Sequence, residues 1–269
     1  MTESMSRPSV ISWQSAGGVR TVRLSNPPAN ALGQALIGEL AEALDSFEQS
    51  TDQVLLFASE LPGFFAAGAD IKLMSGASAA EFAGYGEALR GTLNRIAASS
   101  RPSIAVIEGR ALGGGLELAM AATLRVGSRT ARLGLPESKL GLIPGAGGTA
   151  RLPRLVGRGR ALDIMLTGRE VDAEEAHRIG LLDRLTEPGG AEAEALALAA
   201  VLRANSPAAL SEVIRCVDDA DDLALDQALQ READRVNTLF SGPQAQEGLR
   251  AFLAKRRPDF TTTTTRESP

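Results

Sequence analysis

The stretch Ala111-Leu112-Gly113-Gly114-Gly115-Leu116-Glu117-Leu118-Ala119 follows an expected buried strand at Ser103–Ile107 and leads into an expected helix that starts near Gly115. Consecutive glycines permit a tight strand-to-helix corner, because glycine adopts backbone conformations that other residues avoid. The first N–H groups of a helix have no partner within it, and together with the helix dipole they favour negative charge. We therefore expect Gly114 to lie where an anionic group can bind.

Two glutamates lie in apolar surroundings along the chain. Glu117 occupies the first turn of the expected helix, and Glu137 follows the apolar run Leu133-Gly134-Leu135-Pro136. Burial disfavours a charged carboxylate, and two carboxylates about 4 Å apart repel by roughly 4 kcal/mol at an effective dielectric constant of 20. One of the two would then stay protonated, as in an acid–base pair. The spacing along the chain leaves open whether the two side chains meet in space.

The composition is typical of a soluble globular protein, with 44% hydrophobic and 23% charged residues. A net charge of −5, from 28 Lys and Arg against 33 Asp and Glu, gives no overall basic field to attract nucleic acid. The single cysteine, Cys216, excludes an intrachain disulfide and fits a reducing compartment. Residues 1–10 lack the apolar core of a signal peptide, and no apolar stretch approaches the roughly 18 residues that span a bilayer. We expect a cytoplasmic protein that does not enter a membrane.

Strand and helix patterns alternate through the first 190 residues, and helical patterns follow. This order predicts an α/β core at 10–200, a C-terminal helical module at 201–260, and tails at 1–9 and 261–269. The expected strands are a hairpin at 10–24, Val54–Phe57, Ser103–Ile107 and Leu181–Leu185, and the expected helices include one with Leu36, Leu40, Leu44 and Phe47 on one face, Ala79–Ala97, Glu192–Asn205, one that Ser206-Pro207 caps, 223–240 and 243–256.

Other candidate sites are weaker. The segment Gly145-Ala146-Gly147-Gly148-Thr149-Ala150 formally fits a dinucleotide-binding fingerprint, but Pro144 stands where a strand should end and Pro153 should interrupt the following helix. His177, the only histidine, has no expected catalytic partner, and the acidic cluster Asp218–Asp222 lacks the ligand spacing of a calcium loop. We expect no metal site.

Several segments, in order, resemble the crotonase, or enoyl-CoA hydratase/isomerase, superfamily. The resemblance covers about residues 10–260 and implies a ββα spiral core that binds an acyl-CoA thioester. It also implies C-terminal helices that assemble homotrimers, often stacked as hexamers. The segments are Asn26–Leu32, Phe65–Lys72, Ala111–Ala119, Pro136–Glu137 with Gly141–Thr149, and Glu247–Arg256.

By this resemblance, the backbone N–H groups of Ala69 and Gly114 form an oxyanion hole for the thioester oxygen. The family's hydratases use two glutamates, which match Glu117 and Glu137. Glu117 would orient and deprotonate water for attack at C3 of a trans-2-enoyl-CoA, and Glu137 would deliver a proton to C2. The resemblance thus implies an enoyl-CoA hydratase of fatty acid or branched acyl-CoA metabolism, with no metal or redox cofactor.

Further positions match segments that line the family's CoA channel. One departure is Thr123, which stands where the family commonly has Asp after the helix that bears Glu117, so local support there is in doubt. The expected CoA-binding residues are Ala29, Ala67, Asp70, Ile71, Lys72, Phe252 and Lys255.

Four alternatives remain open. An isomerase that shifts a 3-enoyl to a 2-enoyl thioester needs only one acid–base carboxylate. Leu89–Ile96 and Ala111–Leu118 also resemble methylglutaconyl-CoA hydratases, which leaves a branched substrate open. RNA binding would need a basic helix face, whereas the corresponding helix here carries Glu81 and Glu87 beside Arg90 and Arg95 and is mixed in charge. Both glutamates argue against an inactive acyl-CoA-binding scaffold.

Overall fold

A computed structural model describes residues 9–260 of the chain. It consists of two compact units, one formed by residues 9–99 and 103–197 and the other by residues 100–102 and 198–260. The first unit contains both sheets and the second is helical. Apart from Ser9, the tails predicted at 1–9 and 261–269 lie outside the described residues.

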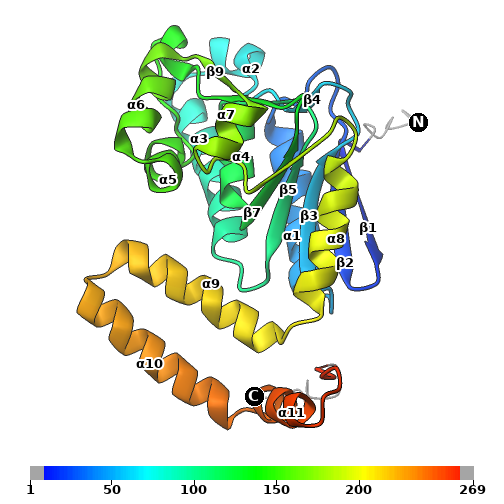
Figure 1. Cartoon of the computed structure of the whole chain (residues 1–269). Helices are drawn as coiled ribbons and strands as arrows, with labels where there is room; N and C mark the ends of the chain where they lie inside the picture. Colours follow the sequence, from blue (N-terminus) through cyan, green and yellow to red (C-terminus); the bar gives the residue numbers. More distant parts are fainter. Residues whose placement is uncertain (1–8, 261–269) are drawn as a thin grey trace. The chain divides into compact units, whose positions relative to one another are not determined.

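The larger sheet has six strands in the order β1-β2-β3-β5-β7-β10 (Figure 1). The predicted hairpin is confirmed, because β1 and β2 pair in antiparallel fashion, and the remaining neighbours are parallel. The bounds are β1 Ile11–Ala16, β2 Val19–Leu24, β3 Val54–Ser59, β5 Ser103–Ile107, β7 Leu124–Ser128 and β10 Arg184–Thr186. The strand predicted at Leu181–Leu185 starts later, since the N–H groups of Leu181 and Leu182 donate to the carbonyl of Ala176 instead.

The smaller sheet has four strands of three residues each, in the order β4-β6-β8-β9. They are β4 Phe64–Ala66, β6 Arg110–Leu112, β8 Arg132–Gly134 and β9 Glu170–Asp172. We expected the glycine run to follow Ser103–Ile107 directly, which is wrong because β6 lies between them. Three residues are too few to show an alternating pattern.

Successive strands alternate between the two sheets. β3 is followed by β4, β5 by β6 and β7 by β8, and each pair leads into helical structure. This repetition is the ββα spiral that the resemblance implied, which the structure confirms. Because β4, β6 and β8 are parallel neighbours, the segments that follow them leave from the same edge of the smaller sheet.

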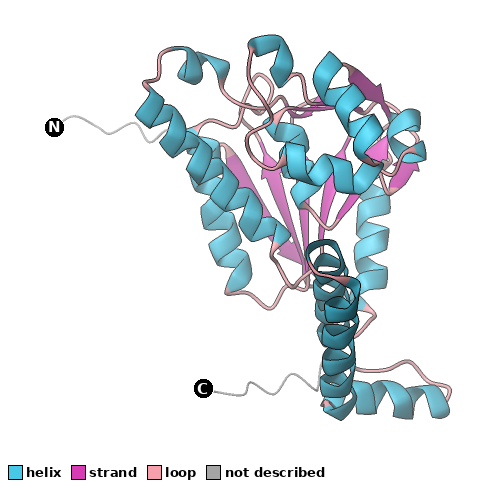
Figure 2. Ribbon diagram, turned by 90° about the vertical axis from the view of Figure 1, so that its left-hand side faces the viewer, coloured by secondary structure: helices cyan, strands magenta, loops and turns pink. Residues whose placement is uncertain are grey.

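Helices surround the sheets in the first unit, and Figure 2 shows the strands between them. The predicted face of α1 is buried, and α3 begins at a capping box formed by Ser78 and Glu81. We expected Pro153 to interrupt a helix, which is wrong because Pro153 lies inside α5. Proline lacks the N–H that would bond the carbonyl four residues earlier, and that carbonyl belongs to exposed Thr149. The helices are α1 Gln34–Glu48, α2 Ile71–Ser75, α3 Ala79–Ala97, α4 Gly114–Ala121, the 3₁₀ helix η1 Glu137–Leu140, α5 Gly148–Val156, α6 Arg158–Thr167, α7 Ala173–Arg178 and α8 Ala191–Arg203, of which α8 continues into the second unit.

Helix α4 is buried along its whole length and starts at Gly114, as the glycine corner predicted. Gly113 precedes it with a positive φ of 52°, a conformation that favours glycine. A side-chain carbon on Gly115 would lie 2.0 Å from the carbonyl oxygen of Ala66 in β4. Glycine at 115 therefore lets the start of α4 pack directly on the backbone of the smaller sheet.

The second unit contains α9 Pro207–Asp222, α10 Leu225–Ser241 and α11 Pro243–Leu253. As predicted, Ser206 caps α9, where its hydroxyl accepts from the N–H of Ala209 at 3.1 Å. Many large apolar side chains of these helices are exposed, among them Val213, Val217, Leu229, Val236, Phe240 and Leu253. Across residues 9–260, no helix combines the length and the hydropathy needed to cross a membrane.

Candidate active site

One cavity of about 220 Å³ in the first unit brings together the four residues predicted to be catalytic. Ala69, Gly114, Glu117 and Glu137 all line it. They come from the segments after β4, β6 and β8, so the common edge of these strands places them together. Most of the remaining lining is apolar and includes Met74, Phe82, Leu89, Leu142 and Ile143.

Two backbone N–H groups lie close together on the wall of this cavity. A side-chain carbon on Gly114 would lie 3.7 Å from the amide nitrogen of Ala69, and one on Gly68 would lie 3.3 Å from that of Gly114. Within residues 9–260, neither the Ala69 nor the Gly114 N–H donates a hydrogen bond. The pair is therefore free to bind one oxygen atom of a ligand.

Glu117 is held in place by a neighbouring loop. Its side chain is 2% exposed, and its Oε1 atom accepts hydrogen bonds from the N–H groups of Ala146 at 2.7 Å and Gly148 at 2.8 Å. Burial raises the pKa of the Glu117 carboxyl, and the two amides act in the opposite direction. The loop that formally matched a dinucleotide fingerprint thus binds a carboxylate of the protein itself.

The environment of the Glu137 carboxyl group differs from that of Glu117 in its hydrogen bonding. Its Oε2 atom is buried without a hydrogen-bond partner among the residues that the structure describes. Burial, with a smaller contribution from the charge of Glu117, raises the pKa of Glu137 to about 7. A side-chain carbon on Gly113 would lie 2.8 Å from its Oε1, so the glycine corner leaves room for this carboxyl group. The two glutamates share one cavity and differ in how firmly their oxygens are bound.

Tyr85, the chain's only tyrosine, was missed by the sequence reasoning. It is 8% exposed, and its hydroxyl donates to the carbonyl of Leu32 at 2.8 Å. The N–H of Leu32 in turn donates to the carbonyl of Gly68, so Tyr85 supports the segment that carries Ala69. Burial, followed by the charge of Asp70, raises the pKa of Tyr85 to about 12. A single tyrosine on the apolar face of the predicted helix 79–97 was the available signal.

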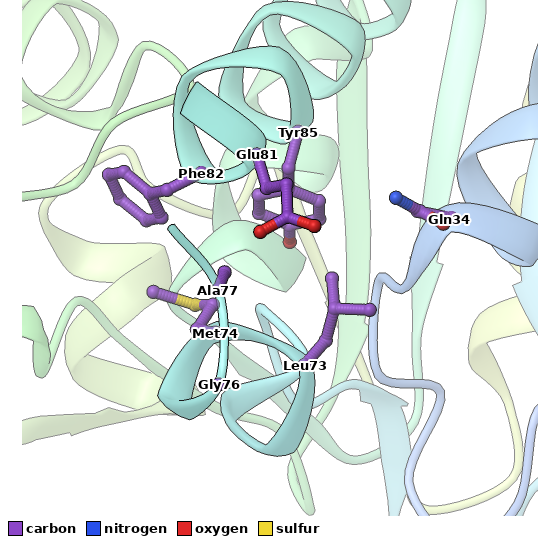
Figure 3. Close-up of a pocket in the computed structure, with 8 residues that line it drawn as sticks. All are labelled: Gln34, Leu73, Met74, Gly76, Ala77, Glu81, Phe82 and Tyr85. Carbon is purple, nitrogen blue, oxygen red and sulfur yellow. The ribbon is translucent and has the colours of Figure 1, made fainter. Parts of the chain in front are cut away.

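Two further cavities adjoin the first. One, of about 260 Å³, is drawn in Figure 3, where Tyr85 and Phe82 of α3 lie across from Met74 and Leu73 of α2. The other, of about 460 Å³, extends past Met74 and Phe82 toward Leu142. Met74 and Phe82 line all three cavities, so the three lie next to one another around these two side chains.

Comparison with known proteins identifies the family. Residues 14–263 match the family model described as enoyl-CoA hydratase/isomerase. The chain belongs to this family. It is 39% identical over 250 residues to a probable enoyl-CoA hydratase of Rhizobium meliloti, covering 92% of this chain and 96% of the relative. It is 38% identical over 247 residues to a probable enoyl-CoA hydratase of Bacillus subtilis, covering 90% and 95%.

Solved structures of the family share the fold. The enoyl-CoA hydratase of Bacillus anthracis superposes with a TM-score of 0.90 at 33% identity, covering 93% of this chain and 98% of that one. An enoyl-CoA hydratase of Geobacillus kaustophilus gives a TM-score of 0.91 at 32% identity, covering 95% and 97%. The α/β fold class and the family predicted from the sequence are therefore confirmed.

The residues expected to bind CoA fall into two groups. In the first unit, the N–H of Ala67 donates to the carbonyl of Ala29 at 2.9 Å, and the Asp70 carboxylate caps α2. Ile71 is exposed and lines the cavity of about 460 Å³, and Lys72 is exposed at the start of α2. Ala67, Asp70, Ile71 and Lys72 flank Ala69 along one stretch of chain, and Ala29 joins it through this hydrogen bond. The role of all five in CoA binding stays a prediction.

Phe252 and Lys255 belong to the second unit. Phe252 is 81% exposed near the end of α11, and Lys255 follows that helix with a φ of 53°. Their contact with CoA also stays a prediction.

Thr123 supplies the local support that its departure from the family pattern had put in doubt. Its hydroxyl accepts from the N–H of Ser103 at 3.0 Å, and its own N–H donates to the Ser103 hydroxyl at 3.0 Å. This reciprocal pair ties the end of α4 to the start of β5. In the part of the chain that the structure describes, no three His, Cys, Asp or Glu side chains cluster as a metal site would require.

Proposed function

We propose that this chain is an enoyl-CoA hydratase, which adds water reversibly across the C2=C3 bond of a trans-2-enoyl-CoA thioester. The observation that carries the proposal is a single cavity with two free backbone N–H groups and two unlike carboxyl groups. Family membership and the similar proteins named as hydratases support the same reaction.

The N–H groups of Ala69 and Gly114 would bind the thioester oxygen. Attack of water at C3 moves electrons toward that oxygen, which becomes enolate-like. Preorganised donors stabilise the developing charge, and one such donor contributes about 2.7–4 kcal/mol. The same two donors bind the neutral carbonyl less strongly, so they accelerate the reaction rather than only binding substrate.

The two glutamates would move the protons. Glu117, ionised and fixed through Oε1, has its other oxygen available to take a proton from the attacking water while hydroxide adds to C3. Glu137, protonated at the start, gives its proton to C2. After one turnover Glu117 is protonated and Glu137 ionised, and exchange with solvent or with each other restores the starting state. The two titrations are coupled, because each charge affects the other.

The direct test follows loss of the conjugated absorbance of enoyl thioesters with short, long and branched acyl groups. We expect 3-hydroxyacyl-CoA as the product, identified by mass spectrometry, and the series measures acyl preference. A mass unchanged from the substrate would instead indicate an isomerase, and binding without turnover would indicate an acyl-CoA-binding scaffold.

Glu137 should set an alkaline limit on hydration. Its carboxyl group must be protonated to donate a proton to C2, and its pKa is raised to about 7. The protonated fraction falls as pH rises through that value, so log kcat/KM should decline above about pH 7 with a slope approaching −1. The acidic limit belongs to Glu117, which must be ionised and whose pKa is also raised. Initial rates between about pH 5 and 9 test this, and a flat profile above pH 6 would contradict it.

We also propose that the protein assembles as a homotrimer or hexamer in the cytoplasm and serves fatty acid or branched acyl-CoA metabolism. The exposed apolar side chains of α9, α10 and α11 support assembly, since monomeric surfaces rarely carry so many. The single cysteine supports a reducing compartment. Light scattering at several concentrations tests the assembly.

A further inference from the structure

The loop from Gly145 to Gly148 lies between Glu117 and two arginines. On one side, the N–H groups of Ala146 and Gly148 donate to Oε1 of Glu117. On the other side, the carbonyl of Ala146 accepts from Nη1 of Arg151 at 2.9 Å. The carbonyl of Gly145 accepts from Nη1 of Arg90 at 3.3 Å. Arg90 therefore holds the peptide group that carries the Ala146 N–H, and Arg151 holds the next peptide group, which lies between the two that donate to Glu117.

Arg151 is built into this position. Its Nη2 donates to Oδ1 of Asn94 in α3 at 2.8 Å, so the guanidinium bridges α3 and the loop. Gly147 has a φ of 112°, and a side-chain carbon there would lie 2.1 Å from Nη1 of Arg151. Only glycine lets the loop approach the guanidinium so closely. Arg151 is absent from the lining of the catalytic cavity, whereas Arg90 is part of it.

We propose that Arg151, held by Asn94, is a positioning residue for Glu117. It fixes the loop so that two amides bind Oε1, which leaves Oε2 as the oxygen that takes the proton from water. This inference rests on the proposed hydratase function and adds a residue that acts through the loop rather than on the substrate.

The charges around Glu117 give Arg151 a second effect. Tyr85 and Arg90 face Glu117 from α3, Glu137 faces it from η1, and Arg151 faces it from α5. The positive charges of Arg151 and Arg90 favour the ionised carboxylate and oppose the burial that raises its pKa. Burial of Arg151 itself lowers its pKa from the usual value, although guanidinium stays charged.

Three variants separate geometry from charge. Arg151→Gln removes both, and we expect kcat to fall roughly 10–10²-fold with KM changed little, since misplacing a catalytic group acts on the chemical step. The acidic limb of the pH profile should move to higher pH by up to about one unit, because a nearby positive charge is lost.

Arg151→Lys keeps the charge but loses the two-pronged guanidinium that bonds both Ala146 and Asn94, so it should keep the acidic limb and recover kcat only in part. Arg158→Gln removes one exposed charge from α6 and is the matched control.

A readout without substrate completes the test. The pKa of Glu117 is measured by ¹³C NMR of glutamate-labelled protein, with Glu117→Gln used for assignment. This pKa should rise in Arg151→Gln and stay unchanged in Arg158→Gln. In the Glu117→Gln background, Arg151→Gln should lower the residual rate no further. An unshifted Glu117 pKa, or an equal loss of rate in both backgrounds, would overturn the proposal and leave Arg151 a structural residue. Lack of turnover by the unmodified protein would instead contradict the hydratase function, and the NMR titration would still decide the role of Arg151.

Discussion

Glu117→Gln and Glu137→Gln should each lower kcat for enoyl thioester hydration at least about 10²-fold, the scale of a lost general acid or base. The substitutions are nearly isosteric. In Glu117→Gln the amide oxygen can still accept from Ala146 and Gly148, so the loop should stay in place while the proton acceptor is lost. In Glu137→Gln no hydrogen bond to Oε2 is lost, because none exists among the described residues.

The control for both variants is Glu42→Gln, which changes an exposed glutamate of α1 that is not part of the cavity lining. It should retain the full rate, and all three variants should unfold near the temperature of the unmodified protein. The double variant should be little slower than the worse single variant, because residues that act in one step are not additive. A rate near normal in either single variant would remove that glutamate from the mechanism.

Gly115→Ala should destabilise the protein by about 3 kcal/mol or more, at or above the upper end of what overpacking usually costs. The added carbon would lie 2.0 Å from the carbonyl oxygen and 2.6 Å from the carbonyl carbon of Ala66, and backbone atoms cannot rotate away as a side chain can. Relief requires α4 to move from β4. That movement would separate Gly114 from Ala69, so hydration should fall together with stability.

Gly91→Ala in α3 is the matched control, since nothing lies within 4 Å of the added carbon. Because alanine restricts the unfolded chain more than glycine does, this variant should be about 0.4–1 kcal/mol more stable. Urea unfolding followed by circular dichroism measures both variants. A midpoint for Gly115→Ala equal to that of the unmodified protein would contradict the close approach of α4 to β4.

The sequence predicted the elements that repeat a pattern over several turns or residues. The face of α1 from Leu36 to Phe47 and the bounds Ala79–Ala97 of α3 follow from helical periodicity, and both are observed. The strands β4, β6 and β8 were not predicted, because three residues are too few to show an alternation of apolar and polar side chains. Such short strands form because of their neighbours in the sheet. The ββα spiral was predicted from the family resemblance and not from the periodicity of apolar residues.

The candidate site was predicted by residue but not by geometry. Resemblance selected Ala69, Gly114, Glu117 and Glu137, and the cavity contains all four. The hydrogen bonds from the N–H groups of Ala146 and Gly148 to Glu117 depend on the path of the loop backbone, which the residue types do not reveal. The contacts of Arg151 were invisible for the same reason.

The alternation of strands between the two sheets has an evolutionary consequence. In the proposed mechanism, each turn of the spiral ends in a different part of the site: the first carries Ala69 after β4, the second Gly114 and Glu117 after β6, and the third Glu137 after β8. In that mechanism, a change in the third segment would alter proton delivery while the other two segments would still polarise the thioester. Such a scaffold would let one part of the site change at a time, so a different reaction on the same thioester would require substitutions in only one segment.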